Sequence, residues 1–136
     1  MSLKAGPEDK QEKAAPGKID LDAPTEFLET ESGLKYRILR KADGKKPTAS
    51  NKVTVHYKGW LDDESIFDSS YRRNEKISFG LNQVIKGWTE GMQLVGSGGM
   101  IELDIPYQLG YGERGSPGAI PPKANLHFIV ELFDVK

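Results

Sequence analysis

The sequence contains no cysteine among its 136 residues. This absence excludes disulfide bridges, thiolate zinc sites and cysteine nucleophiles, and it leaves the redox compartment open. No run of apolar residues approaches the roughly 18 that a membrane span requires. The formal net charge is only -1, so no strong field attracts nucleic acid or an acidic membrane surface. We therefore expect a protein that uses neither nucleic acid nor a membrane as its partner.

Residues that carry out bond-breaking chemistry are scarce as well. The two histidines, His56 and His127, fall on the polar faces of expected strands, which favours a structural or solvated role over a metal site. The acidic run Asp62–Glu64 is typical of a solvated turn after a strand. Ser69 and Ser70 lack a base and an orienting group in the surrounding sequence. We expect no metal ion and no cofactor.

The length and the 37% hydrophobic content suit one ordinary domain. Residues 1–23 are rich in charge, alanine, glycine and proline and show no apolar periodicity. They are predicted to be a flexible N-terminal extension, with a docking segment as the alternative, and residues 24–136 to form the domain. The first residues lack the apolar stretch of a signal peptide, so we expect a cytoplasmic protein, or an exported one whose signal has been removed.

Apolar residues alternate in four stretches, residues 34–39, 53–61, 101–106 and 126–135, which predicts four strands. The last stretch is apolar on both faces, because Ile129, Phe133 and Val135 lie opposite its other apolar residues, so we expect it at the centre of the sheet. Only residues 86–94 have a helical pattern, and glycines end it. The sequence predicts an α+β fold in which antiparallel strands wrap across one short helix.

The stretch "QVIKGWTEGM" places Trp88 between Gly87 and Gly91. Each glycine inside a helix costs about 1 kcal/mol relative to alanine, so packing must hold this helix and Trp88 is the expected anchor. The long loop Gly110–Asn125 carries apolar residues and is expected to be ordered. One short helix cannot bury all the large apolar side chains without leaving a hollow. We therefore expect an apolar pocket among Tyr57, Phe67, Phe79, Val84, Ile85, Trp88, Tyr111, Ile120 and Phe128.

Four motifs occur in a specific order: "VTVHYKGWL", "IFDSS", "VIKGWTEGM" and "IPYQLGYGERGSPGAIPPKANLHFIVELFDV". Their order, spacing and chemistry resemble the FKBP-type peptidyl-prolyl cis–trans isomerases over Gly33–Lys136. No insert interrupts the loop after Tyr111, which resembles the single-domain, bacterial-like members. The resemblance implies a twisted antiparallel β-sheet wrapped around one short α-helix, and catalysis of rotation about X-Pro bonds that assists protein folding.

The resemblance also implies roles for individual residues. The catalytic set would be Asp68, Tyr111 and Trp88, with the indole as the pocket floor and the Tyr111 hydroxyl reaching a bound carbonyl. The Ile85 N–H would donate to the ligand. The implied partners are proline-containing peptides and proteins and the macrolides rapamycin and tacrolimus, which would bind a monomer. The implied substrate-binding residues are Tyr57, Phe67, Ile77, Val84, Ile85, Ile120 and Phe128.

Three features depart from the family pattern. Ile77 stands where many relatives carry an aromatic residue, Ser116 and Ala119 are smaller than their usual counterparts, and the stretch from Asp68 to Val84 is slightly short. Two alternatives remain open at this stage. One is a binding module that holds proline-containing partners with weak catalysis, and the other is a nucleic-acid binder that uses the basic loop 41–52.

Overall fold

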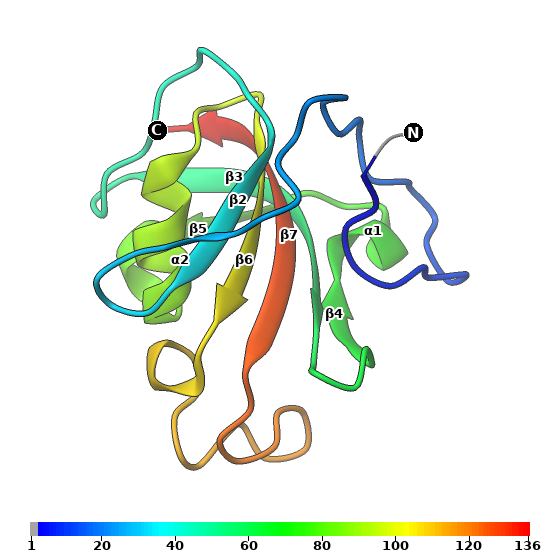
Figure 1. The fold of residues 1–136 in the computed structure, drawn as a ribbon, viewed down its shortest axis with the longest axis vertical. Helices are drawn as coiled ribbons and strands as arrows, with labels where there is room; N and C mark the ends of the chain where they lie inside the picture. The colour runs from blue at the N-terminus through cyan, green and yellow to red at the C-terminus, as the bar shows by residue number, and fades with distance from the viewer. Residues whose placement is uncertain (1–2) are drawn as a thin grey trace.

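A computed structural model of the chain describes residues 3–136. The strands form one antiparallel sheet in the order β1-β2-β6-β7-β3-β4, and β5 also pairs with β3 (Figure 1). The strands are β1 (Leu28–Glu29), β2 (Lys35–Arg40), β3 (Lys52–Trp60), β4 (Ile66–Ser69), β5 (Ile77–Gly80), β6 (Met100–Ile105) and β7 (Leu126–Val135).

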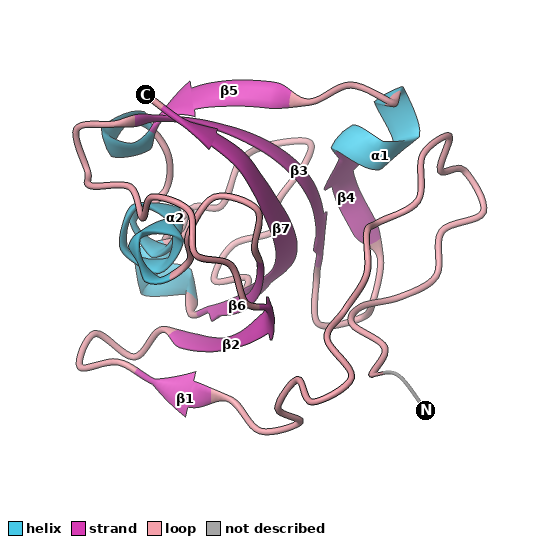
Figure 2. Cartoon of the chain, turned by 90° about the horizontal axis from the view of Figure 1, so that it is seen from above, coloured by secondary structure: helices cyan, strands magenta, loops and turns pink. Residues whose placement is uncertain are grey.

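The predicted helix is present as α2 (Lys86–Gly91) and continues as a 3-10 turn over Met92–Leu94. It packs against the concave side of the curved sheet, as Figure 2 shows from above. This arrangement confirms the α+β fold class. Further short 3-10 turns cover Leu81–Gln83 and Tyr107–Leu109.

A one-turn helix that the sequence did not predict, α1 (Ser70–Arg73), follows β4 directly. It has only 4 residues, fewer than a helical apolar period needs to become visible in a sequence. Ser69 caps it, since its hydroxyl accepts the N–H of Arg72, and Asn74 ends it in a left-handed conformation. The strands β1, β4 and β5 also escaped prediction, and they too have 4 residues or fewer.

The sheet buries apolar residues on both faces. The main cluster lies between the sheet and α2, and a smaller outer cluster lies on the opposite face around Leu39, Trp60, Tyr71, Met100 and Ile129. β7 contributes to both clusters and lies between β6 and β3, so its predicted central position is confirmed. Amphipathic alternation in this sheet therefore separates two apolar layers rather than core from solvent.

The predicted face of Val135 was wrong. Opposite β3, the partners of the adjacent residues Thr54 and Val55 are Asp134 and Leu132, so Phe133 is an extra residue in β7. Such a bulge shifts every later side chain to the other face. Val135 accordingly packs against the main cluster, and Phe133 is 38% exposed.

The glycines on either side of Trp88 bring α2 close to β6. A Cβ atom on Gly87 would lie 2.6 Å from Ile105 Cγ2, and one on Gly91 would lie 2.6 Å from Leu103 Cδ2. Both contacts are shorter than carbon atoms tolerate, so a larger residue would force α2 or the facing side chains to shift. The glycines thus allow the indole to be 97% buried without separating the two layers, since it is only 3% exposed.

The N-terminal segment, residues 3–23, contains no helix or strand and lies on the side of the sheet opposite α2. Figure 1 shows it in dark blue passing beside α1. Its side chains Leu3, Ala5 and Ile19 pack against the outer cluster. These contacts favour the docking-segment alternative, while the flexibility of the segment stays a prediction. Among residues 3–136, no helix is both long and apolar enough to cross a bilayer.

Candidate functional site

A cavity of about 500 Å³ opens between the concave face of the sheet and the start of α2. Strand β3 supplies Tyr57, β4 supplies Phe67 and Asp68, and β7 supplies Phe128. The turn before α2 and the loop after β6 complete the wall. The lining residues are Tyr57, Phe67, Asp68, Phe79, Gln83, Val84, Ile85, Trp88, Tyr111 and Phe128.

Aromatic rings surround the indole of Trp88, which forms the floor of the cavity. The rings of Tyr57, Phe79 and Phe128 lie 5.3, 5.7 and 5.4 Å from the indole and are inclined to it by 87°, 83° and 87°. Edge-to-face pairs of this kind are a favoured geometry for aromatic side chains. Phe67 stands perpendicular to Phe128 at 5.5 Å. The four rings therefore fix the shape of the hollow above Trp88.

Gly59 on β3 keeps the wall in place. A Cβ atom there would lie 2.6 Å from both Phe128 Cε1 and Phe67 Cζ. The motif "KGW" thus uses glycine because two rings occupy the space that a side chain would fill.

Asp68 is the one carboxylate that lines the cavity, and its oxygens are engaged by neighbours. The Tyr57 hydroxyl donates to Oδ2, and Oδ1 accepts from Arg73 Nη1 at 2.7 Å and from the Ser69 N–H at 2.9 Å. Burial, with the hydrogen bond to Asp68, raises the pKa of Tyr57 to about 12. The hydrogen bond between Arg73 and Asp68 raises the pKa of Arg73. The phenol therefore remains a donor and the guanidinium remains charged at neutral pH.

Two polar groups that line the cavity, the Ile85 N–H and the Tyr111 hydroxyl, have no hydrogen-bond partner within residues 3–136. The Ile85 N–H takes no part in the backbone hydrogen bonds of the turns and loops in residues 3–136, while its carbonyl accepts from the N–H groups of Trp88 and Thr89. Tyr111 lines the cavity from the long loop and is 45% exposed. The cavity thus offers a backbone donor on one side and a phenolic hydroxyl on the other.

The loop that carries Tyr111 is held by its own hydrogen bonds. Ser116 and Ile120 exchange backbone bonds at 2.9 and 2.8 Å, and the Gly112 N–H donates to the Tyr107 carbonyl at 2.8 Å. Gly115 has φ +70°, and a Cβ there would lie 2.3 Å from the Ile120 carbonyl oxygen, so glycine is required.

Two residues of the predicted substrate-binding set do not line the cavity. Ile77 pairs with Val55 at the start of β5 and is half-buried against the main cluster. Ile120 is 5% exposed and lies in the core beneath the loop. The remaining eight residues of the predicted catalytic and binding sets, Asp68, Tyr111, Trp88, Tyr57, Phe67, Val84, Ile85 and Phe128, surround it together.

Gln83 and Arg73 belong to the site but were not assigned to it from the sequence. Phe79, which was named for the expected apolar pocket, lines the cavity from β5. Gln83 lies in a 3-10 turn and Arg73 in the one-turn helix α1. Elements this short gave no sequence signal for the direction of either side chain.

The histidines are embedded in hydrogen-bond networks away from the cavity. His56 Nδ1 lies 2.7 Å from Ser70 Oγ, and its ring stacks on Tyr71 at 4.8 Å, so of the two expected roles it has the structural one. Burial lowers the pKa of His56. His127 bridges Asp104 and Asp62 at 2.7 and 2.6 Å. In the part of the chain that the structure describes, no group of three His, Asp or Glu side chains could hold a metal ion.

Comparison with known proteins identifies a family and several relatives to which this chain is similar. A profile of the FKBP-type peptidyl-prolyl cis-trans isomerases matches residues 43–133. The chain is 48% identical over 106 residues to a probable FKBP-type peptidyl-prolyl cis-trans isomerase of Haemophilus influenzae, covering 78% of this chain and 44% of that protein. It is 50% identical over 105 residues to FkpA of Escherichia coli, covering 77% and 38%. The chain therefore spans less than half the length of these bacterial relatives.

Solved structures show the same fold. The crystal structure of Escherichia coli FkpA superposes with a TM-score of 0.80 at 46% identity and covers 83% of this chain and 53% of that one. The crystal structure of AtFKBP13 superposes with a TM-score of 0.74 at 32% identity and covers 82% and 99%. The aromatic cavity, the motifs and these matches agree, and the chain belongs to the FKBP-type peptidyl-prolyl cis–trans isomerase family.

Proposed function

We propose that this chain catalyses cis–trans isomerisation of X-Pro bonds in peptide and protein substrates, with the proline ring seated on Trp88. The observation that carries the proposal is the ring arrangement: Trp88 is 3% exposed and forms the floor, and three rings nearly perpendicular to its indole form the walls. Apolar hollows with a few oriented polar groups are the usual form of ligand sites.

Rotation about the X-Pro bond needs no bond to the enzyme. The barrier is about 18–20 kcal/mol because rotation breaks the amide resonance. The planar imide is more charge-separated than the twisted one, so removing water from its carbonyl favours the twisted transition state. Binding of the proline ring further stabilises that conformer when contacts are better in the transition state than in the ground state. A 10⁵-fold acceleration requires about 7 kcal/mol.

In this mechanism Asp68 and Tyr111 position and polarise rather than transfer protons. The oxygens of Asp68 already accept from Tyr57, Arg73 and the Ser69 N–H, which suits a fixed negative charge better than a proton shuttle. The Ile85 N–H and the Tyr111 hydroxyl are the groups that hydrogen-bond the substrate carbonyls.

The test is an NMR-exchange or protease-coupled isomerase assay on proline tetrapeptides with purified protein. Catalysis that saturates with peptide supports the proposal. Peptide binding without acceleration of the exchange would overturn it in favour of a binding module.

The proposed proline site above Trp88 also predicts macrolide binding. Rapamycin and tacrolimus are expected to bind in the cavity, with the pipecolinyl ring on Trp88 in place of proline, and to inhibit the reaction. Isothermal titration calorimetry measures the binding directly. Absence of heat at tens of micromolar protein would show that the loop carrying Ser116 and Ala119 excludes these ligands.

A further inference from the structure

Beneath the N-terminal segment, residues 3–23, the outer face of the sheet buries charged side chains. Lys58 on β3 and Glu131 on β7 are each only 4% exposed. An isolated charge removed from water is costly unless it is paired and hydrogen-bonded. The partners of these groups therefore show what the surface is built to hold.

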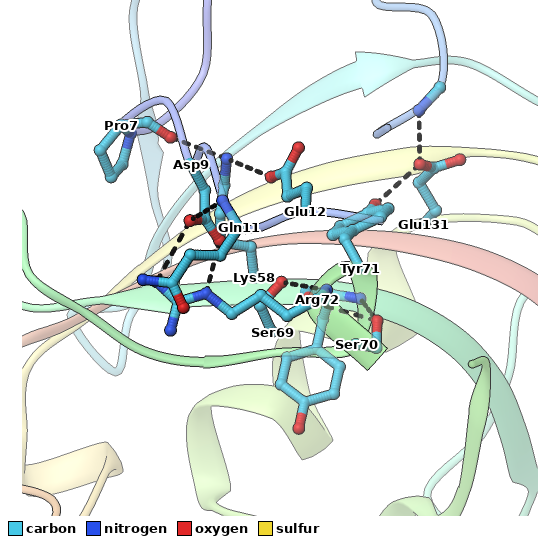
Figure 3. A network of polar contacts seen from close by, with 12 residues as sticks. Pro7, Asp9, Gln11, Glu12, Lys58, Ser69, Ser70, Tyr71, Arg72 and Glu131 are labelled. Carbon is cyan, nitrogen blue, oxygen red and sulfur yellow. Dashed lines mark hydrogen bonds and ion pairs between the residues drawn. The ribbon is translucent and has the colours of Figure 1, made fainter. Parts of the chain in front are cut away.

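The N-terminal segment supplies partners for both. Lys58 Nζ donates to the Pro7 carbonyl at 2.8 Å and to Glu12 Oε1 at 3.2 Å (Figure 3). Glu131 Oε1 accepts from the Gly17 N–H at 2.6 Å and from the Tyr71 hydroxyl at 2.7 Å. Without the segment, Lys58 would lose both of these acceptors.

The N-terminal segment also forms hydrogen bonds with helix α1. Asp9, whose side chain is 3% exposed, accepts from Arg72 Nε at 2.6 Å and from Arg72 Nη2 at 3.2 Å, a two-point pairing that fixes direction as well as charge. The hydrogen bonds with Arg72 lower the pKa of Asp9. The N–H groups of Lys13 and Ala14 donate to the Tyr71 carbonyl at 3.0 and 3.2 Å.

Helix α1 needs such support, because one turn is too short to be stable by itself. It is also the element that connects the outer face to the cavity. Arg72 faces the N-terminal segment, and the next residue, Arg73, donates to Asp68 Oδ1 at 2.7 Å and lies 3.4 Å from the Tyr57 hydroxyl. Consecutive side chains of a single turn thus contact Asp9 on one side and the carboxylate of the cavity on the other.

From this connection we infer that Asp9 is a positioning residue for the isomerase reaction: through Arg72 and α1 it fixes Arg73, and thereby the Asp68 carboxylate that lines the cavity. The inference rests on the proposed function, since it assigns Asp9 an effect on catalysis. It makes the N-terminal segment a docked part of the domain. The alternative, a flexible extension, predicts that Asp9 has no effect on the cavity.

The test uses the full chain with Asp9→Asn, which keeps the size of the side chain and removes its charge. The matched control is Glu8→Gln, because Glu8 is the neighbouring carboxylate but is 78% exposed and pairs only with the exposed Lys4. Asp9→Asn is expected to lower kcat about two- to fivefold with little change in KM, the loss expected from one weakened positioning hydrogen bond. Glu8→Gln is expected to leave both unchanged.

Two further readouts separate positioning from stability. The ¹³Cγ chemical shift of Asp68 is expected to move in Asp9→Asn and to return in Asp9→Glu, which restores the charge. In an Asp68→Asn background, Asp9→Asn is expected to have no additional effect on kcat, because the two residues act in series. Full additivity, or a lower melting temperature with unchanged kcat and unchanged Asp68 shift, would overturn the inference.

Should Asp9→Asn fail to fold, Arg72→Lys serves instead, since it keeps the charge and loses the two-point geometry. The expected changes in kcat and in the Asp68 shift are smaller and in the same direction, and their absence counts against the inference. The chemical shift also distinguishes the two proposals. A wild-type protein without isomerase activity would refute the proposed function. An Asp68 chemical shift that is unchanged by Asp9→Asn would refute the connection from Asp9 to the Asp68 carboxylate.

Discussion

Trp88 offers the sharpest test of whether the apolar floor carries the rate. Trp88→Leu removes three edge-to-face contacts, each worth about 0.5–1.5 kcal/mol, and leaves an unfilled volume. Large-to-small changes of this kind cost about 3–5 kcal/mol. One term opposes the loss: Trp88 Nε1 is the buried side-chain polar atom in residues 3–136 that has no hydrogen-bond partner. Its removal recovers about 1–3 kcal/mol of desolvation cost.

The net expectation is a loss of about 2 kcal/mol in the free energy of unfolding for Trp88→Leu. Trp88→Phe keeps a ring on the floor and also relieves the unpaired N–H, so we expect a change within about 1 kcal/mol. For activity, Trp88→Leu is expected to lower kcat/KM about tenfold or more, and Trp88→Phe less. Urea denaturation measures the first pair of values and the NMR-exchange assay measures the second.

Two polar variants provide the comparison. Tyr111→Phe removes one hydrogen bond of about 0.5–1.5 kcal/mol, so its loss in kcat/KM is expected to be tenfold at most. Asp68→Asn keeps the shape and removes the charge, so its loss measures the electrostatic part. The reasoning fails if either change abolishes activity while Trp88→Phe yields a folded, fully active protein. Polar chemistry rather than the aromatic hollow would then carry the rate.

Three predictions concern stability. Hydrogen bonding to Asp104, and then to Asp62, raises the pKa of His127 to about 9. Because the folded pKa is raised, His127 contributes about 1–2 kcal/mol to the free energy of unfolding after screening; this contribution is fully present below the unfolded pKa of about 6.5 and is lost as pH rises through 9. A difference in unfolding free energy between wild type and His127→Gln that persists at high pH would contradict this. Arg37→Ala breaks a 2.7 Å pair with Glu102 whose side chains are 9% and 7% exposed, so urea denaturation should show a loss of about 3–5 kcal/mol, whereas replacing both partners by Met and Leu should cost much less. Gly87→Ala should lower stability by about 1–3 kcal/mol despite its better helix propensity, because the stiff, buried side chain at the contact cannot give way; an unchanged melting curve would show that α2 shifts freely.

Local pattern was sufficient wherever an element was long or its chemistry unusual. The alternation in residues 126–135 predicted a central strand because both of its faces are apolar, and β7 does lie between β6 and β3. Trp88 between two glycines predicted a helix held by packing, and both glycines lie against β6. Nine of the eleven residues named for the site from the sequence and its family resemblance surround one cavity.

Only the tertiary structure decided which side chains of the short elements reach the cavity and which partners the residues buried on the outer face of the sheet have. Phe79 rather than Ile77 lines the cavity, because β5 has only 4 residues and its register on β3 sets which of them reaches the indole. The face of Val135 depended on a bulge that no alternation reveals. The partners of Lys58 come from residues 46 and 51 positions away, Glu12 and Pro7. Composition described that segment as polar and aperiodic, but only the folded sheet brings the Glu12 carboxylate to the buried ammonium of Lys58.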